Sequence, residues 1–167
     1  MGNPLDFAEF YHQARDDCLR TVLAAVGNQD RAQDLVDEAF ARACASWRTV
    51  SRHPAPAAWV VRTALNANIS RWRRRHREVP VADPETVADR PAPVGTGGSP
   101  VDPRIMAALL RLQLRQRQVV ALRLFLDFDT GRTAEVLGVA PSTVKAHLAR
   151  AIASLRDELI PSQQQES

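Results

Sequence analysis

The sequence predicts an all-α protein built from two small helical domains that are joined by a flexible linker rich in Pro and Gly. Apolar residues recur at spacings of three and four in both halves of the chain, and no segment shows strand alternation bounded by turn residues. Residues 79–103 hold six Pro and three Gly in 25 positions, without helical period. We therefore expect domains at 1–78 and 104–160, a linker at 79–103 and a disordered tail at 161–167.

The N-terminal half predicts three helices. An apolar stripe begins at Phe7 and ends near Gly27-Asn28, and Asp30 is a plausible N-cap for a second helix. One side of that helix is apolar, and its opposite side shows acidic residues. A loop follows at 48–55, and Pro56 suits the first turn of a third helix.

The C-terminal half carries the spacing of a helix-turn-helix. Small Ala134 permits close packing of two helices, Gly138 allows the turn, and Val144 packs the second helix back. Pro141 and Ser142 begin that second helix. Its outward positions are of types that contact phosphates and base edges in a major groove, namely Ser142, Thr143, Lys145, Ala146, His147 and Arg150. An αα-hairpin that only packs is the alternative.

Charge is divided along the chain in blocks, although the net charge is only +3. Residues 1–47 carry 4 Arg against 8 acidic residues, whereas residues 48–77 carry 8 Arg and no acidic residue. Five of those arginines lie within 71–77, more than a helix dipole alone would explain. This pattern favours two surfaces with two partners, the basic one for nucleic acid, with an acidic protein or a membrane surface as alternatives.

The sequence lacks the residues and motifs that several classes of function need. No apolar run is long enough to span a bilayer and the N-terminus lacks a signal peptide, so we expect a cytoplasmic protein without membrane insertion. No P-loop, dinucleotide motif or nucleophile triad is present. A zinc site from His12, Cys18 and Cys44 is disfavoured by its spacing. We expect no enzyme, cofactor, metal or small-molecule substrate.

Four stretches together resemble a known family. Asp34–Ala43 (DLVDEAFARA) is similar to the DLVQEAFLRA stretch of the extracytoplasmic-function (ECF) sigma factors of bacterial RNA polymerase. Trp59–Asn66 with Arg71–Arg74 looks like the family's WLxxIAxN…RR stretch. Leu137–Val139 with Thr143–Lys145, and the residues from Arg150 to Arg156, match its region 4. The resemblance covers about residues 5–77 and 104–160.

The resemblance implies a sigma factor that binds core RNA polymerase and directs promoter recognition, melting of the minus-ten element and transcription initiation. Its partners would be core polymerase, promoter DNA and an anti-sigma factor, and the linker would run toward the RNA exit path. Implied polymerase contacts are Asp34, Leu35, Asp37, Glu38 and Arg42. Implied minus-ten contacts are Arg48, His53, Trp59, Arg62, Asn66, Arg71, Arg73, Arg74, Arg75 and Arg77, with a flipped base held by the loop at 48–57. Implied minus-thirty-five contacts are Ser142, Thr143, Lys145, Ala146, His147 and Arg150.

The chain departs from the family pattern mainly near the turn motif. Thr133 stands where the family prefers Ile, and other departures are Ser70, Gln113, Arg132, Ser142, Ala146 and His147. Two other classes of function stay open on the sequence alone. One is a stand-alone helix-turn-helix regulator that binds duplex DNA as a dimer. The other is a sigma-like antagonist that binds polymerase or an anti-sigma factor without initiating.

Overall fold

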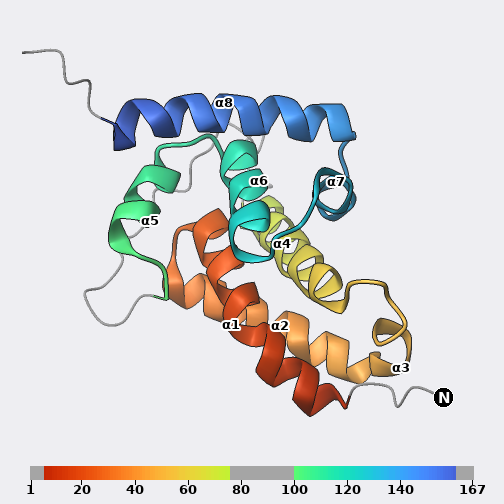
Figure 1. The fold of residues 1–167 in the computed structure, drawn as a ribbon. Helices are drawn as coiled ribbons and strands as arrows, with labels where there is room; N and C mark the ends of the chain where they lie inside the picture. Colours follow the sequence, from red (N-terminus) through yellow and green to blue (C-terminus); the bar gives the residue numbers. More distant parts are fainter. Residues whose placement is uncertain (1–5, 76–99, 161–167) are drawn as a thin grey trace, which may run out of the picture.

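The computed structural model describes residues 6–75 and 100–160, and every regular element within these ranges is an α-helix. The all-α prediction is therefore confirmed. The N-terminal domain, residues 6–75, contains α1 (Phe7–Val26), α2 (Gln29–Ala45), α3 (Trp47–Val50) and α4 (Pro56–Arg75). The C-terminal domain, residues 100–160, contains α5 (Pro103–Leu110), α6 (Leu114–Phe125), α7 (Thr130–Leu137) and α8 (Pro141–Leu159) (Figure 1).

The turn between α1 and α2 forms where the sequence predicts it, but with a different cap. Gly27 takes a left-handed conformation (φ 82°), and its N–H donates to the Leu23 carbonyl at 2.7 Å. The Asn28 side chain then caps α2 by accepting from the Arg31 N–H at 2.9 Å. The prediction that Asp30 is the N-cap is wrong. Asp30 lies inside the first turn of α2, where its negative charge interacts favourably with the helix dipole.

The segment between α2 and α4 is more regular than the loop that the sequence predicts. It contains the short helix α3, and the following turn is held by the Ala55 N–H, which donates to Nδ1 of His53 at 3.0 Å. Pro56 begins α4 as predicted, because a first-turn residue needs no amide hydrogen there. Five aromatic rings pack beneath this corner of the domain: Phe7, Phe10, Tyr11, Phe40 and Trp47.

The described part of the C-terminal domain begins within the last residues of the predicted linker. Val101 is buried, and the Asp102 side chain caps α5 by accepting from the Arg104 N–H at 2.8 Å. Residues 76–99 and the predicted tail at 161–167 lie outside the described residues. Their expected flexibility therefore stays a prediction.

The helix-turn-helix forms as predicted. Gly138 ends α7 in the left-handed conformation (φ 65°), and Pro141 opens α8 within three residues. Val144 is fully buried and packs with Val119 and Ala134, which places α8 firmly against α6 and α7. The N-terminal half of α8 is thereby held in a fixed position with its outer side open.

The two domains pack against each other, which the sequence did not predict. α1 contacts α6 as extensively as it contacts α2, and α7 lies against α4 (Figure 1). One hydrophobic cluster contains residues of α1, α2 and α4 together with Met106, Leu122 and Val136 of the C-terminal domain. Two amphipathic halves, each small for an independent core, thus bury part of their apolar surface in one another.

Thr133 in α7 carries an unfavourable feature of this core. The residue is fully buried, and its Oγ1 has no hydrogen-bond partner among the described residues. Because a buried hydroxyl without a partner costs free energy, Thr133→Val should raise the free energy of unfolding by about 1 kcal/mol and the Tm by about 3 °C. Thermal unfolding followed by circular dichroism measures both. Thr133→Ser is the control: it keeps the hydroxyl, loses a methyl group and should destabilise, and equal stability of all three proteins would contradict the account.

Candidate polymerase and nucleic-acid interface

The acidic side of α2 is exposed in part. Asp34, Asp37 and Arg42 are exposed, and Glu38 is half-buried. Leu35 is fully buried in the core beside Val36. The prediction that Leu35 contacts polymerase is therefore wrong. Leu35 lies on the apolar stripe of α2, and its side chain stabilises the domain rather than facing a partner.

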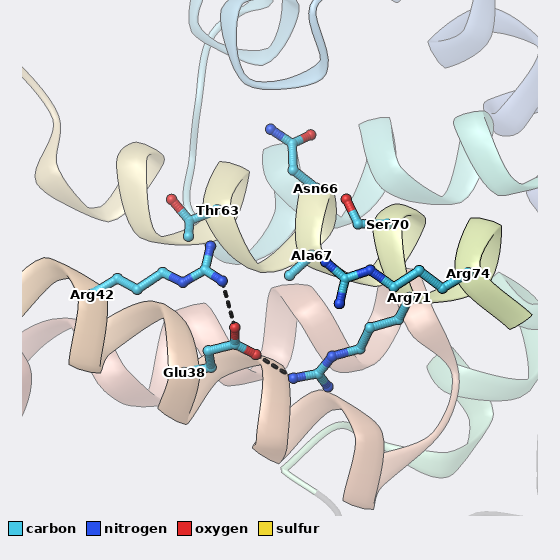
Figure 2. A pocket seen from close by; sticks show the side chains of 8 residues that line it. All are labelled: Glu38, Arg42, Thr63, Asn66, Ala67, Ser70, Arg71 and Arg74. Atoms are coloured by element: carbon cyan, nitrogen blue, oxygen red, sulfur yellow. Dashed lines mark hydrogen bonds and ion pairs between the residues drawn. The ribbon is translucent and has the colours of Figure 1, made fainter.

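Glu38 links the acidic helix to the basic one (Figure 2). Its Oε1 accepts from Arg42 Nη2 at 2.6 Å, and its Oε2 accepts from Arg71 Nη2 of α4. One carboxylate thus holds two guanidinium groups from two helices. The implied polymerase surface and the implied DNA surface consequently meet at a single side chain, which no spacing in the sequence indicated.

A polar pocket of about 350 Å³ lies around this ion pair, between α2 and α4 (Figure 2). Asn66, Ser70 and Arg74 lie on its α4 side at helical spacing, and Glu38 is its one acidic group. Thr63 also lines the pocket. Neither Thr63 nor Ser70 was predicted as a site residue, although they lie three and four positions from Asn66 and so share its helix face. Hydroxyl, amide and guanidinium groups along one face suit an anion such as a phosphate.

The end of α4 concentrates positive charge at the protein surface. Arg73, Arg74 and Arg75 are exposed in its last turn, and Arg71 is half-buried. Earlier in the helix Arg62 and Asn66 are exposed, so the basic surface extends along α4. Arg77 lies outside the described residues.

Three further implied minus-ten residues have different surroundings. Arg48 in α3 is exposed. Trp59 is half-buried and packs on the main core cluster, so part of its side chain stabilises the N-terminal domain. His53 lies in the turn before α4, and its Nε2 is 3.6 Å from Oε1 of Glu135 in α7. The turn with His53 is therefore in contact with the C-terminal domain.

The outer face of α8 exposes four of the six residues that the turn motif predicts there. Ser142, Lys145, Ala146 and Arg150 are exposed and share one face, with Lys145 and Arg150 at opposite edges. Thr143 and His147 flank that face and are half-buried. His147 Nδ1 is buried with no hydrogen-bond partner among the described residues. The His147 side chain is therefore less accessible to a DNA groove than the exposed side chain of Lys145.

The two cysteines have contrasting environments. Burial, with a smaller contribution from Asp17, raises the pKa of the Cys18 thiol to about 12, whereas Cys44 is exposed. Within residues 6–75 and 100–160 no three His, Cys, Asp or Glu side chains gather as metal ligands would. In the same ranges no helix has the length and apolar character needed to cross a membrane.

Family models match both domains. Residues 10–78 match Sigma-70 region 2, and residues 103–155 match Sigma-70, region 4. The RNA polymerase sigma-E factor of Streptomyces coelicolor is 34% identical over 161 residues, which cover 96% of this chain and 89% of that protein. The ECF RNA polymerase sigma factor SigM of Mycobacterium tuberculosis is 30% identical over 156 residues, covering 92% of this chain and 77% of that protein.

A solved structure agrees with the sequence relatives. The sigma factor RpoE of Bartonella quintana, solved in complex with the anti-sigma factor NepR, is 25% identical and superimposes with a TM-score of 0.73. The alignment covers 95% of this chain and 99% of that one. Both helical domains, in the order and with the motifs described above, are thus accounted for by one family. The chain belongs to the extracytoplasmic-function RNA polymerase sigma factors.

Proposed function

We propose that this sigma factor divides its work among three surfaces. The exposed acidic side of α2, with Asp34, Asp37 and Arg42, would dock on the clamp coiled coil of core RNA polymerase. The basic face of α4 and the turn before it would bind the minus-ten element. The outer face of α8 would enter the minus-thirty-five major groove.

One observation carries this proposal: an acidic and a basic surface lie side by side on α2 and α4, joined at Glu38. A protein that holds polymerase with one helix and DNA with the next needs opposite charges on adjacent surfaces. A stand-alone DNA-binding regulator has no use for the acidic surface. Membership of the sigma family also disfavours that alternative.

At the minus-ten element, the arginines of α4 would hold phosphates while the turn with His53 accepts a flipped base. Phosphate contacts supply affinity and register without reading sequence. Extruding a base costs a few kcal/mol, which contacts in a pocket offset. Sigma factors are initiation factors, so we propose no reaction catalysed by this chain and no cofactor.

An anti-sigma factor is a second proposed partner. The Bartonella quintana relative was solved with one, and the similarity covers nearly all of both chains. Because its main partner would be core polymerase, we place the protein in the cytoplasm. A sigma-like antagonist would share these partners and differ only in failing to initiate.

The outer face of α8 provides the test of promoter reading. Lys145→Ala should relax discrimination at one or two positions of the minus-thirty-five element, at about 1–3 kcal/mol for a lost base contact. Arg150→Ala, at the other edge of that face, should lower activity evenly because it removes a phosphate contact. Transcription by each mutant holoenzyme from a library of minus-thirty-five variants measures both. Equal, sequence-blind losses would refute base reading by Lys145, and no loss from either would favour the antagonist.

A further inference from the structure

The pocket between α2 and α4 carries a surplus of positive charge. It is lined by Arg42 of α2 and by Arg71 and Arg74 of α4. Its one acidic side chain is Glu38, so three cations face one anion and the formal charge of the lining is +2. Figure 2 shows the guanidinium groups of Arg42 and Arg74 pointing toward each other across the small side chain of Ala67. The positive groups therefore converge on one place instead of spreading along the surface.

The ion pairs at Glu38 leave most of these donors available. Arg42 and Arg71 each donate to the carboxylate through Nη2, and a guanidinium group has five N–H donors. Their side chains are 58% and 42% exposed, so the other donors are open to solvent. Within residues 6–75 and 100–160, the Arg74 side chain has no hydrogen-bond or ion-pair partner. Glu38 thus fixes two of the guanidinium groups, and the remaining donors can bind an anion.

Uncharged polar groups continue the same face of α4. Asn66, Ser70 and Arg74 follow one another at intervals of four positions, so they lie along one side of the helix over about 12 Å. The side chains of Asn66 and Ser70 make no hydrogen bond to any described residue. The Thr63 hydroxyl donates to the Trp59 carbonyl oxygen at 2.8 Å, and its own oxygen can still accept. The pocket therefore offers neutral donors and acceptors beside its charged groups.

Charge and shape together indicate the class of ligand. A phosphate monoester carries about −1.5 to −2 at pH 7, whereas each phosphate of a nucleic-acid backbone carries a single negative charge. The lining of +2 matches the monoester. The volume of about 350 Å³ leaves room for a small group attached to the phosphate. None of the described residues that line the pocket is aromatic, so a base would find no ring to stack on, whereas sugar hydroxyls would find hydroxyl and amide partners.

We propose that this pocket binds a small phosphate monoester whose attached group is polar and not aromatic, as in a sugar phosphate. The phosphate would lie between the guanidinium groups of Arg42 and Arg74, with Arg71 held beside it by Glu38. The sugar hydroxyls would lie along α4 beside Ser70. The site belongs to the free chain and does not depend on the polymerase and promoter contacts proposed above.

Isothermal titration calorimetry of the full chain tests the site, with ribose 5-phosphate as the probe. We expect saturable binding of one molecule per chain at low salt, where the partly exposed arginines are least screened. Dimethyl phosphate, a diester with one negative charge, should bind at least about tenfold more weakly, because it forms fewer charge-assisted hydrogen bonds. Ribose, which lacks the phosphate, should show no measurable binding.

Substitutions of Ser70 separate charge from size. Ser70→Asp places a second carboxylate in the pocket, and the Kd for ribose 5-phosphate should rise at least about tenfold because like charges then face each other. Ser70→Asn adds a side chain of the same size without the charge, and it should raise the Kd much less. Ser154→Asp makes the same substitution at an exposed position of α8 and should leave the Kd unchanged. Ser70 is exposed as well, so no core packing is lost, and circular dichroism verifies the fold of each variant.

Three results would overturn the proposal. They are the absence of saturable binding of ribose 5-phosphate, equally tight binding of dimethyl phosphate, and a rise in Kd with Ser70→Asp that Ser70→Asn or Ser154→Asp reproduces. Equal binding of the diester would indicate a place for a nucleic-acid backbone phosphate instead. All measurements are made without polymerase or promoter DNA, so a failure of this site is distinguishable from a failure of the proposed function.

Discussion

Reversing the charge of both Asp34 and Asp37 to Arg is expected to weaken binding to core RNA polymerase at least about a hundredfold, since like charges placed opposite each other at an interface cost several kcal/mol. Both carboxylates are exposed on α2, so the helix should fold unchanged. Co-purification with core enzyme measures the loss, and circular dichroism verifies the fold.

Glu38 stays unchanged in this variant for a structural reason. Glu38 would face the same partner under the proposed function, but it also holds Arg42 and Arg71, and its reversal would disturb both surfaces together. The control is a double reversal of equal charge change, Asp16→Arg with Asp157→Arg, at exposed positions on α1 and α8. Stoichiometric co-purification of the Asp34 and Asp37 variant, or equal losses in both proteins, would show that α2 does not dock on polymerase.

Removing Arg73, Arg74 and Arg75 together is the second change with a large expected effect. Each phosphate contact contributes about 0.7 to 0.9 to the steepness with which the logarithm of the binding constant falls against the logarithm of salt concentration. The triple Ala variant should therefore lower that steepness by roughly 2 to 3. Promoter binding by holoenzyme should weaken across all sequences, because phosphate contacts do not read bases. Binding to fluorescent promoter DNA over a range of salt concentrations gives both quantities.

The matched control for the arginine tract removes the same charge elsewhere. Arg104 and Arg111 are exposed at α5, and Arg156 is exposed in the last turn of α8, six positions beyond Arg150. Their triple Ala variant should leave the salt slope nearly unchanged. A loss confined to one promoter sequence with an unchanged slope would contradict the phosphate role of the α4 tract.

The helices and their turns follow from local chemistry, which a sequence states directly. Between two apolar stripes, Gly138 is suited to end one helix and Pro141 to begin the next, and the helix-turn-helix forms around them. Asp30 shows the limit of such reasoning: Asn and Asp are both good caps, and the choice between Asn28 and Asp30 depends on where the preceding turn ends. Helix boundaries of this kind need the three-dimensional course of the backbone.

The contacts between helices were less accessible to sequence reasoning. Leu35 lies within a stretch identified by its family resemblance, yet its helical position places it on the buried side of α2. Glu38 pairs with Arg71, 33 positions away, and Arg117 with Ala25, 92 positions away. No periodicity links such residues, because tertiary packing alone decides which of several exposed-looking polar groups meet.

As a sigma factor, this chain should convert core RNA polymerase into a promoter-specific enzyme. Run-off transcription from a library of promoter sequences, by core polymerase with and without the purified protein, tests it most directly. Transcripts are expected only when the protein is present, from templates that share a minus-ten and a minus-thirty-five element at fixed spacing. Stoichiometric binding to core polymerase without a transcript from any template would contradict it and would establish a sigma-like antagonist instead.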